Sequence, residues 1–360
     1  MGLRRVEDML SKTGTASREA VWFTSPDTAE IIPEDLGVEG FSSLKDHGLK
    51  IRTIFSGISA GTEMLVYHGK APKNLPIETG EKNGSSANLD FPVKYGYCNV
   101  GRVLESKSEK FRPGDVVFSF HPHETEFVTN ETSCVLIPPG VDPKLGVFIA
   151  NIETAIGIVH DSKPLLGECA AVFGLGVVGL LVSYLLKKKA GVQKLIAIDP
   201  IEERRKLASK FGANKAIHPG EAMGELDLPA IDGRPDLVVE VSGSPSALQQ
   251  AISISGKESR IVVGSWYGDK EVSLNMGRTF HRNRNKIISS QVSSIGPDLS
   301  GRWDKRRRLE YAVSLLSEIP LEDLISDVFP FERAADAYRK ISERPRDTLQ
   351  VVLDYSQNSR

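Results

Sequence analysis

The stretch Ala170-Ala171-Val172-Phe173-Gly174-Leu175-Gly176-Val177-Val178-Gly179 places three glycines between an apolar run and a helical pattern. The run before Gly174 suits a buried strand, and apolar residues then recur at helical spacing, at Val178, Leu181, Val182, Leu185 and Leu186. In such a strand-turn-helix unit, Gly174 makes the tight turn, Gly176 lets the backbone approach a pyrophosphate, and Gly179 lets the helix close on the strand. The helix N-terminus then faces the phosphates. We therefore predict a dinucleotide site at Gly174, Leu175, Gly176, Val177, Val178 and Gly179.

The next apolar run, LIAID, ends in Asp199, which follows Gly179 by 20 residues (199 − 179). A carboxylate at this place accepts hydrogen bonds from the ribose hydroxyls and repels a 2′-phosphate, so NAD is favoured over NADP. Arg204 and Arg205 keep NADP open, because either side chain could reach a 2′-phosphate. Their spacing instead favours the helix that follows the strand. Arg204 stays a candidate cofactor-binding residue.

Further along, Ser242, Gly243 and Gly264 follow two more apolar runs. Ligands of parallel α/β sheets bind outside the carboxyl ends of the strands. We therefore predict that these three residues lie on the nicotinamide side of the cofactor. The alternative is that they are ordinary turn residues.

Three regions of the chain differ in pattern. Residues 19–139 hold short β-rich runs broken by Gly, Pro, Asn and Asp, which predicts an irregular β-rich lobe. Residues 168–292 alternate apolar runs with helical periods, which predicts a doubly wound domain with a parallel sheet. Residues 293–360 hold two amphipathic helices and a final strand, and we expect them to return to the first lobe. Domains are therefore predicted at 1–150, 151–292 and 293–360, with a long loop at 70–92.

Composition excludes several classes of partner. The chain has 45 Lys+Arg against 47 Asp+Glu, so no broad positive field attracts nucleic acid or an anionic membrane. No apolar run is long enough to cross a membrane, and the first residues lack the apolar core of a signal peptide. Cys98, Cys134 and Cys169 form no C-x-x-C pair, which indicates a reducing compartment. We expect a cytoplasmic protein that binds neither nucleic acid nor membrane.

Five motifs lie outside the dinucleotide unit: S-G-I-S-A-G-T-E at 56–63, K-Y-G-Y at 94–97, H-P-H at 121–123, S-W-Y-G-D at 265–269 and R-W-D-K-R-R-R-L at 302–309. With them the chain resembles the medium-chain dehydrogenase/reductase superfamily, in the branch that includes bacteriochlorophyllide-type hydroxyethyl dehydrogenases. The resemblance implies an α/β protein with a GroES-like β-rich catalytic lobe and a doubly wound Rossmann domain. It implies an enzyme that transfers a hydride at a secondary alcohol or ketone. It also implies that Thr154 packs on the nicotinamide.

The resemblance also shows where the pattern of zinc-binding members breaks. Those members carry a Cys, a His and a Cys or Asp at positions that here hold Ser59 or Ala60, Tyr97, and about Ala150. A catalytic zinc takes three N, S or carboxylate donors and keeps one open position. We therefore predict that no metal is bound.

His121 and His123 offer the alternative. Together with Glu63 or Cys98 they could form an improvised metal site. A lone H-x-H pair is more often two partly exposed histidines.

Without a metal, a hydrogen-bond donor must stabilise the developing alkoxide and move the proton. Tyr97 is the first candidate, and Lys94 would lower its pKa by stabilising the phenolate. The alternatives are a packing role for Tyr97 and a solvated surface position for Lys94. Glu63 and His123 complete the predicted catalytic set, although the resemblance also allows Glu63 a purely structural role.

Two further features bear on the substrate, which we expect to be a small molecule. Trp266 and Tyr267 would form a flat wall for a cyclic substrate, or else belong to the core. The run 304–308, Asp-Lys-Arg-Arg-Arg, would form a clamp for an anionic substrate, or else a solvated helix face.

Two other functions and one assembly stay open. The first function is reduction of an activated carbon–carbon double bond, and the second is nucleotide binding without catalysis. The resemblance implies a homodimer in which residues 286–290 pair across a two-fold axis, since their apolar, β-branched character suits an intersubunit sheet. The alternative is an edge strand protected by Arg284 and Lys286.

Overall fold

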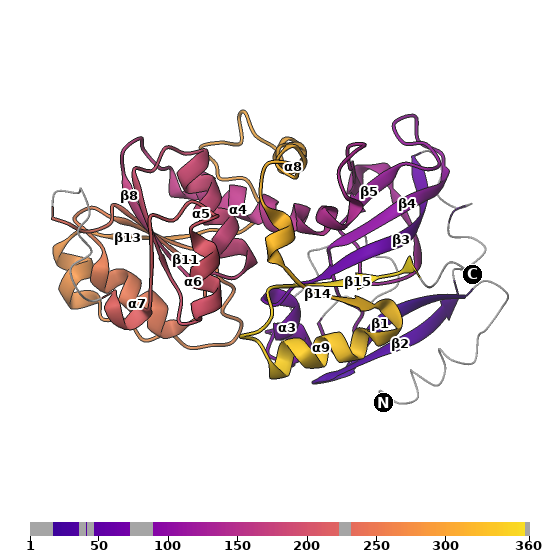
Figure 1. The fold of residues 1–360 in the computed structure, drawn as a ribbon, viewed down its shortest axis with the longest axis horizontal. Coiled ribbons are helices and arrows are strands. Elements are labelled where there is room, and N and C mark those ends of the chain that lie inside the picture. Colours follow the sequence, from indigo (N-terminus) through magenta and orange to yellow (C-terminus); the bar gives the residue numbers. More distant parts are fainter. Residues whose placement is uncertain (1–16, 36–40, 42–46, 73–88, 223–231, 357–360) are drawn as a thin grey trace. The chain divides into compact units, whose positions relative to one another are not determined.

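The computed structural model describes residues 17–35, 41, 47–72, 89–222 and 232–356 (Figure 1). The chain divides into two compact units. The first comprises Met1–Ala150 and Leu324–Arg360, and the second comprises Asn151–Asp323.

The first unit is a β-rich lobe, as predicted. Its seven-stranded sheet has the order β14-β15-β3-β4-β5-β7, β6 also pairs with β3, and β1 and β2 form a separate antiparallel pair. Its elements are β1 (Ser17–Ser25), β2 (Thr28–Asp35), β3 (Gly48–Ile58), α3 (Thr62–Tyr67), β4 (Asn99–Ser106), β5 (Val116–Ser119), β6 (Glu126–Asn130), β7 (Cys134–Leu136), β14 (Ile325–Pro330), α9 (Ala334–Glu343) and β15 (Gln350–Asp354).

Strand β3 organises this lobe because it pairs with β4, β6 and β15. Its alternate residues Leu49 and Ile51 are fully buried and pack with Val117 and Phe127 in one core cluster. The end of β3 leads directly to Ser59, which belongs to the candidate site described below.

The second unit contains a six-stranded sheet in the order β10-β9-β8-β11-β12-β13, and every pair in it is parallel. This order confirms the predicted doubly wound domain and puts the reversal of strand order between β8 and β11. Its elements are α4 (Ile149–Ser162, starting at the boundary), β8 (Cys169–Phe173), α5 (Val177–Lys188), β9 (Lys194–Ile198), α6 (Glu202–Ala208), β10 (Lys215–Ile217), β11 (Leu237–Glu240), α7 (Pro245–Ile254), β12 (Arg260–Val263), β13 (Lys286–Ser289) and α8 (Lys305–Ser314).

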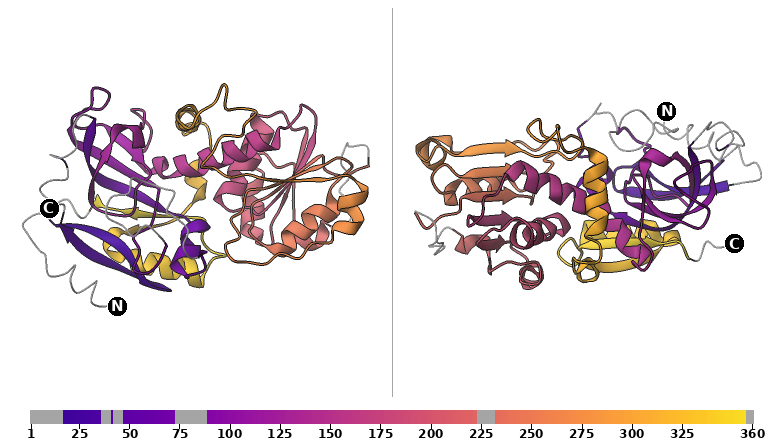
Figure 2. Two further views of the ribbon diagram at one scale, coloured as in Figure 1. Left: turned by 180° about the vertical axis from the view of Figure 1, so that it is seen from behind. Right: turned by 90° about the horizontal axis from the view of Figure 1, so that it is seen from above.

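The C-terminal return begins later than the predicted residue 293. Figure 2 shows the yellow elements β14, α9 and β15 beside the indigo strands of the first unit, and α9 contacts β2 while β15 pairs with β3. Residues 293–323, which include α8, instead belong to the second unit. One contact that joins this segment to the second unit is the buried ion pair between Arg308 on α8 and Glu153 on α4.

Three further sequence predictions concern a long loop, membrane-spanning segments and the cysteines. The predicted loop at 70–92 lies mostly within residues 73–88, outside the described residues. Within the described ranges, no helix has the length and apolar character needed to cross a membrane. Cys98, Cys134 and Cys169 are buried, and none of them forms a disulfide within the described residues.

Candidate functional site

The glycine turn after β8 has the shape that the motif predicts. Gly174 has φ of +91°, and a Cβ there would lie 2.7 Å from the backbone of Ser242. A Cβ on Gly179 would lie 1.7 Å from the carbonyl oxygen of Gly174, so only glycine lets α5 close on the turn. A Cβ on Gly176 would meet nothing within 4 Å. The turn is therefore tight on one side and open at Gly176, where a pyrophosphate is predicted.

Asp199, directly after β9, is tied to this turn. One carboxylate oxygen accepts the Leu175 N–H at 2.7 Å and the other accepts the Ile201 N–H at 2.8 Å. Each carboxylate oxygen can accept two hydrogen bonds, so capacity for ribose hydroxyls remains. Arg204 and Arg205 lie on α6, and the Arg205 guanidinium donates to the Asp199 carbonyl oxygen at 2.7 Å.

The loop after β11 is built on a carboxylate that the sequence analysis missed. Glu240 is fully buried, and its Oε1 accepts the N–H groups of Ser242 at 2.7 Å and Gly243 at 3.1 Å and also the Ser242 hydroxyl. Its Oε2 accepts the Tyr267 hydroxyl at 2.7 Å. Burial and the neighbouring Glu240 raise the pKa of Tyr267. The signal was a charged residue at the end of the apolar run Leu237–Glu240.

Tyr267 and Gly264 both have structural roles within the second unit, besides the substrate wall and the nicotinamide contact that the sequence suggested for them. The Tyr267 hydroxyl binds Glu240, and its ring packs against the core of the second unit, as the alternative stated. A Cβ on Gly264 would lie 2.6 Å from the Ile158 side chain on α4, so close packing by itself accounts for this glycine. Thr154 lies on α4 and is half-buried.

In the first unit, the Tyr97 hydroxyl donates to Ser59 Oγ at 2.6 Å. Burial raises the pKa of Tyr97 well above its ordinary value, and the neighbouring Cys98 and Tyr95 raise it further. Tyr97 is therefore a protonated donor at neutral pH. The expected phenolate, stabilised by a lysine, is wrong.

Lys94 lies in a separate ionic cluster. Its Nζ is 2.9 Å from a Glu34 oxygen and 3.2 Å from a Glu124 oxygen, and only 5% of the residue is exposed. Arg18 contacts the same two carboxylates. The prediction that Lys94 acts on Tyr97 is wrong, and so is the alternative of a solvated surface lysine, because the buried Glu124 and the partly buried Glu34 hold this ammonium group.

Glu63 and His123 meet in the interior of the same unit. His123 is fully buried, with Nε2 2.8 Å from Glu63 Oε1 and Nδ1 2.7 Å from Ser56 Oγ. Glu63 also accepts the Tyr338 hydroxyl and, through Oε2, the Ser59 N–H at 3.0 Å. Glu63 therefore fixes the backbone of the residue to which Tyr97 donates.

Tyr338 and Tyr355 are members of this network that no sequence signal indicated. Tyr338 comes from α9, and the Tyr355 hydroxyl, just after β15, lies 2.9 Å from Ser56 Oγ. Both arrive with the C-terminal return, so no local pattern near the motif at 56–63 reveals them.

Ser59, Tyr97 and Ala150 lie where the resemblance puts the zinc ligands, and none of the three offers a nitrogen, sulfur or carboxylate donor. Ser59 and Tyr97 are hydroxyl residues bonded to each other, and Ala150 has only a methyl group. His121 stacks on Phe127 and contacts Glu124, so it does not join His123 in a shared site. Throughout the described ranges, no three His, Cys, Asp or Glu residues form a group that could hold a metal.

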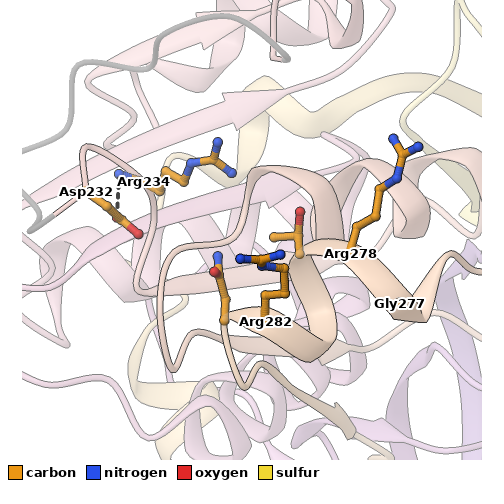
Figure 3. Close-up of a pocket in the computed structure, with 7 residues that line it drawn as sticks. Asp232, Arg234, Gly277, Arg278 and Arg282 are labelled. Carbon is orange, nitrogen blue, oxygen red and sulfur yellow. Dashed lines mark hydrogen bonds between the residues drawn. The ribbon is translucent and has the colours of Figure 1, made fainter.

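A pocket of about 470 Å³ lies elsewhere in the second unit (Figure 3). It is lined by Asp232, Arg234, Gly277, Arg278, Thr279, Arg282 and Asn283. These residues precede β11 and β13, so the pocket lies at the amino ends of parallel strands. The predicted dinucleotide site lies at their carboxyl ends, and the two do not coincide.

The basic run on α8 has both exposed and buried side chains. Arg306 pairs with Glu310 at 2.8 Å, and the Arg307 guanidinium lies 4.2 Å from the centre of the Trp303 ring. Arg308 is buried against Glu153. Arg308 is therefore not available to a substrate, and a clamp formed by the exposed Lys305, Arg306 and Arg307 stays a prediction.

Known proteins resemble this chain over most of its length. A family model described as zinc-binding dehydrogenase matches residues 177–307. The chain is 26% identical to D-guloside 3-dehydrogenase of Escherichia coli (strain K12) over 330 residues, which cover 85% of this chain and 93% of that protein. It is 25% identical to 2-desacetyl-2-hydroxyethyl bacteriochlorophyllide A dehydrogenase of Rhodobacter capsulatus over 335 residues, which cover 88% and 94%.

The fold has solved counterparts as well. The crystal structure of the short chain alcohol dehydrogenase RspB from Escherichia coli CFT073, complexed with NADH, matches with a TM-score of 0.74 and 18% identity. The match covers 95% of this chain and 100% of that chain. At this identity the likeness establishes the fold, a β-rich lobe combined with a doubly wound domain.

Proposed function

This chain belongs to the medium-chain dehydrogenase/reductase superfamily, and from that premise we propose that it transfers a hydride between NAD(H) and a secondary alcohol or its ketone. It is an oxidoreductase of the alcohol dehydrogenase type. The proposal that it works without zinc rests on one observation, the hydrogen bond between Tyr97 and Ser59.

The second unit supplies groups suited to a nicotinamide dinucleotide. The open turn at Gly176 and the N-terminus of α5 suit a pyrophosphate, and Asp199 suits the adenosine ribose. A 2′-phosphate would meet the Asp199 carboxylate, so we propose NAD as the preferred form. The bound nicotinamide ring supplies or accepts the hydride. Tighter binding of NADPH than of NADH by the purified protein would contradict this preference.

Tyr97 and Ser59 take the place of a metal in handling the substrate oxygen. Because Tyr97 donates to Ser59 Oγ, the hydrogen of the Ser59 hydroxyl points away from Tyr97 and can reach a substrate oxygen. When a ketone is reduced, Ser59 would donate this proton to the carbonyl oxygen as the hydride reaches the carbon, and Tyr97 would pass its own proton to Ser59. Tyr97 is only partly buried, so a water molecule would return a proton to its oxygen and no phenolate would remain. Alcohol oxidation runs the same transfers in reverse.

Zinc chemistry is not part of this proposal. A zinc site needs nitrogen, sulfur or carboxylate donors, whereas the positions where the resemblance puts the zinc ligands hold two hydroxyls and a methyl group. Stoichiometric zinc in protein dialysed against a weak chelator would overturn this part of the proposal.

The substrate class follows from the relatives. D-guloside 3-dehydrogenase and the bacteriochlorophyllide enzyme are both named as dehydrogenases of hydroxyl-bearing molecules. We propose that glycosides and polyols with secondary hydroxyls are the first substrates to test. Turnover of enones but of no alcohol or ketone would instead support reduction of a carbon–carbon double bond.

The test of the hydroxyl pair is a set of matched variants. Tyr97→Phe and Ser59→Ala should each lower kcat about 100-fold or more, the usual loss for a general acid, while NADH affinity stays unchanged. Tyr184→Phe removes a phenol hydroxyl from the exposed side of α5 and should leave kcat unchanged. An unchanged kcat in both site variants would contradict the proton route.

We also propose a homodimer that pairs through β13. This strand is at the end of the six-stranded sheet, and 37% of Ile287 is exposed on it. An apolar, β-branched edge of this kind suits strand pairing with a second copy. We propose the cytoplasm, a reducing compartment, as the location of the protein, since its three cysteines are buried and form no disulfide within the described residues.

A further inference from the structure

One arginine of the basic run on α8 turns inward. Arg308 is only 2% exposed, whereas Arg306 and Arg307 beside it lie at the surface. A buried guanidinium is costly unless carboxylate and carbonyl groups surround it. Its partners therefore show what this side chain holds together.

Arg308 binds acceptors from two separate parts of the second unit. Its Nε and Nη2 donate to Glu153 Oε1, at 3.0 and 2.8 Å. Nη2 also donates to the Val292 carbonyl oxygen, and Nη1 donates to the Ser294 carbonyl oxygen at 3.3 Å. The planar fork of an arginine can bind three acceptors in this way, whereas a lysine ammonium lacks that geometry.

Both parts lie toward one half of the predicted cofactor site. Val292 and Ser294 follow β13, at the carboxyl ends of the strands, where ligands of a doubly wound sheet bind. Glu153 precedes Thr154 on α4. By contrast, Asp199 follows β9, on the other side of the strand reversal between β8 and β11. Arg308 is therefore far in the sheet order from the adenosine half.

The α4 surface around this contact is shaped for the guanidinium. Gly157 lies one helical turn after Glu153, and a Cβ there would come within 3.4 Å of Arg308 Nη1. Ser290, at the start of the same segment, donates its hydroxyl to Asp161 on α4 at 2.6 Å. The segment after β13 is therefore attached to α4 at two places, and Arg308 is the buried one.

We propose that Arg308 is a positioning residue for the nicotinamide half of the cofactor. It holds α4 and the segment 290–294 in one arrangement, so that the ring meets a preformed surface. This inference rests on the proposed dinucleotide function. Loss of Arg308 should weaken binding of the nicotinamide half and leave binding of the adenosine half unchanged.

The experiment compares two ligands on the same variants. ADP-ribose carries the adenosine and the pyrophosphate but no nicotinamide, whereas NADH carries all three. The double variant Arg308→Met with Glu153→Met replaces the buried ion pair by apolar groups, an exchange that proteins often tolerate. Arg308→Lys is the conservative variant, and Arg306→Met is the control for charge on α8.

Calorimetry and thermal unfolding give distinct expected results. For the double variant, the Kd of NADH should rise at least tenfold while the Kd of ADP-ribose stays within twofold. Arg308→Lys should fall between the double variant and the wild type, and Arg306→Met should match the wild type. Circular dichroism and a cooperative thermal transition verify that each variant is folded.

Three outcomes would overturn the inference. Equal loss of NADH and ADP-ribose affinity would mean that Arg308 only stabilises the fold. Unchanged affinity for both ligands would mean that the segment needs no such anchor. Failure of the wild type to bind NADH and ADP-ribose would refute the proposed function itself, and this inference with it. That result differs from the first two outcomes, because in both of them the wild type binds the two ligands.

Discussion

Gly96 and His123 show how closely the interior of the first unit is packed. Gly96 has φ of +133°, and a Cβ there would lie 2.6 to 2.7 Å from the His123 imidazole ring. That ring cannot move away easily, because Ser56 and Glu63 hold its two nitrogens. Glycine at position 96 therefore protects the network that fixes the Ser59 backbone.

Gly96→Ala should destabilise the protein. Overpacking and a positive φ each cost about 1–3 kcal/mol, and both apply at this position. Gly140→Ala is the matched control, since Gly140 has φ of +89° and a Cβ there would meet nothing within 4 Å. Urea unfolding should show Gly96→Ala about 1–3 kcal/mol less stable than Gly140→Ala. Equal losses would mean that His123 yields without cost.

Glu124 makes stability depend on pH in the acid range. Burial raises its pKa, but Lys94, His121 and Arg18 outweigh burial and lower the pKa from 4.5 to about 2. A carboxyl whose pKa is lowered on folding stabilises the protein above its unfolded pKa. This contribution is lost as the pH falls from about 4.5 toward 2, and amounts to something on the order of 3 kcal/mol.

Glu124→Gln should remove this acid dependence. The variant is expected to be less stable at pH 7, because Lys94 loses a buried partner. Its urea midpoint should then fall less than that of the wild type between pH 4.5 and 2.5. Glu105→Gln breaks only an exposed contact with Lys50 and should keep the wild-type slope. Parallel curves for wild type and Glu124→Gln would contradict the assignment.

In the strand-turn-helix segment of β8, the glycine turn and α5, one glycine serves the stability of the fold and another serves cofactor binding. Gly179 matters for stability, because any side chain would collide with the Gly174 carbonyl oxygen unless the turn shifts. Gly176 has φ of −69° and open space around it, so alanine fits there without strain. A methyl group at position 176 would instead occupy the space that a pyrophosphate needs.

Gly176→Ala should therefore keep the wild-type Tm and lose at least tenfold in NADH affinity. Gly179→Ala should lower the Tm by several degrees, because a clash of this kind costs roughly 1–3 kcal/mol. Calorimetry with NADH and thermal unfolding of the same samples measure both effects. Full NADH affinity in Gly176→Ala would place the pyrophosphate elsewhere.

For the assembled protein, the proposed dimer predicts a mass of twice the 39.4 kDa chain by light scattering. Ile287→Lys puts a charge on the end strand β13 and should give a monomer. Val328→Lys is the control, because Val328 is 45% exposed on β14, the end strand of the other sheet. Dissociation by Val328→Lys alone would move the interface to that edge.

Much of the fold could be predicted from local patterns. The strand-turn-helix at 169–188, the later strands up to β13, the helices α8 and α9 and the strand β15 all lie where periodicity and turn residues indicated. Asp199 also follows its strand as expected. These features depend on residues within about ten positions of one another, so backbone geometry and burial on one face suffice to define them.

The partners of the functional side chains were decided only by the folded chain. Tyr338 reaches Glu63 across 275 residues, and Tyr355 reaches Ser56 across 299. Lys94 is held by Glu34 and Glu124, and Arg308 by Glu153, although nothing near them in the sequence indicates it. A buried charge without a partner costs too much free energy, so each of these side chains needs a partner of opposite charge. The identity of that partner depends on which distant elements pack together, and only the folded chain decides this.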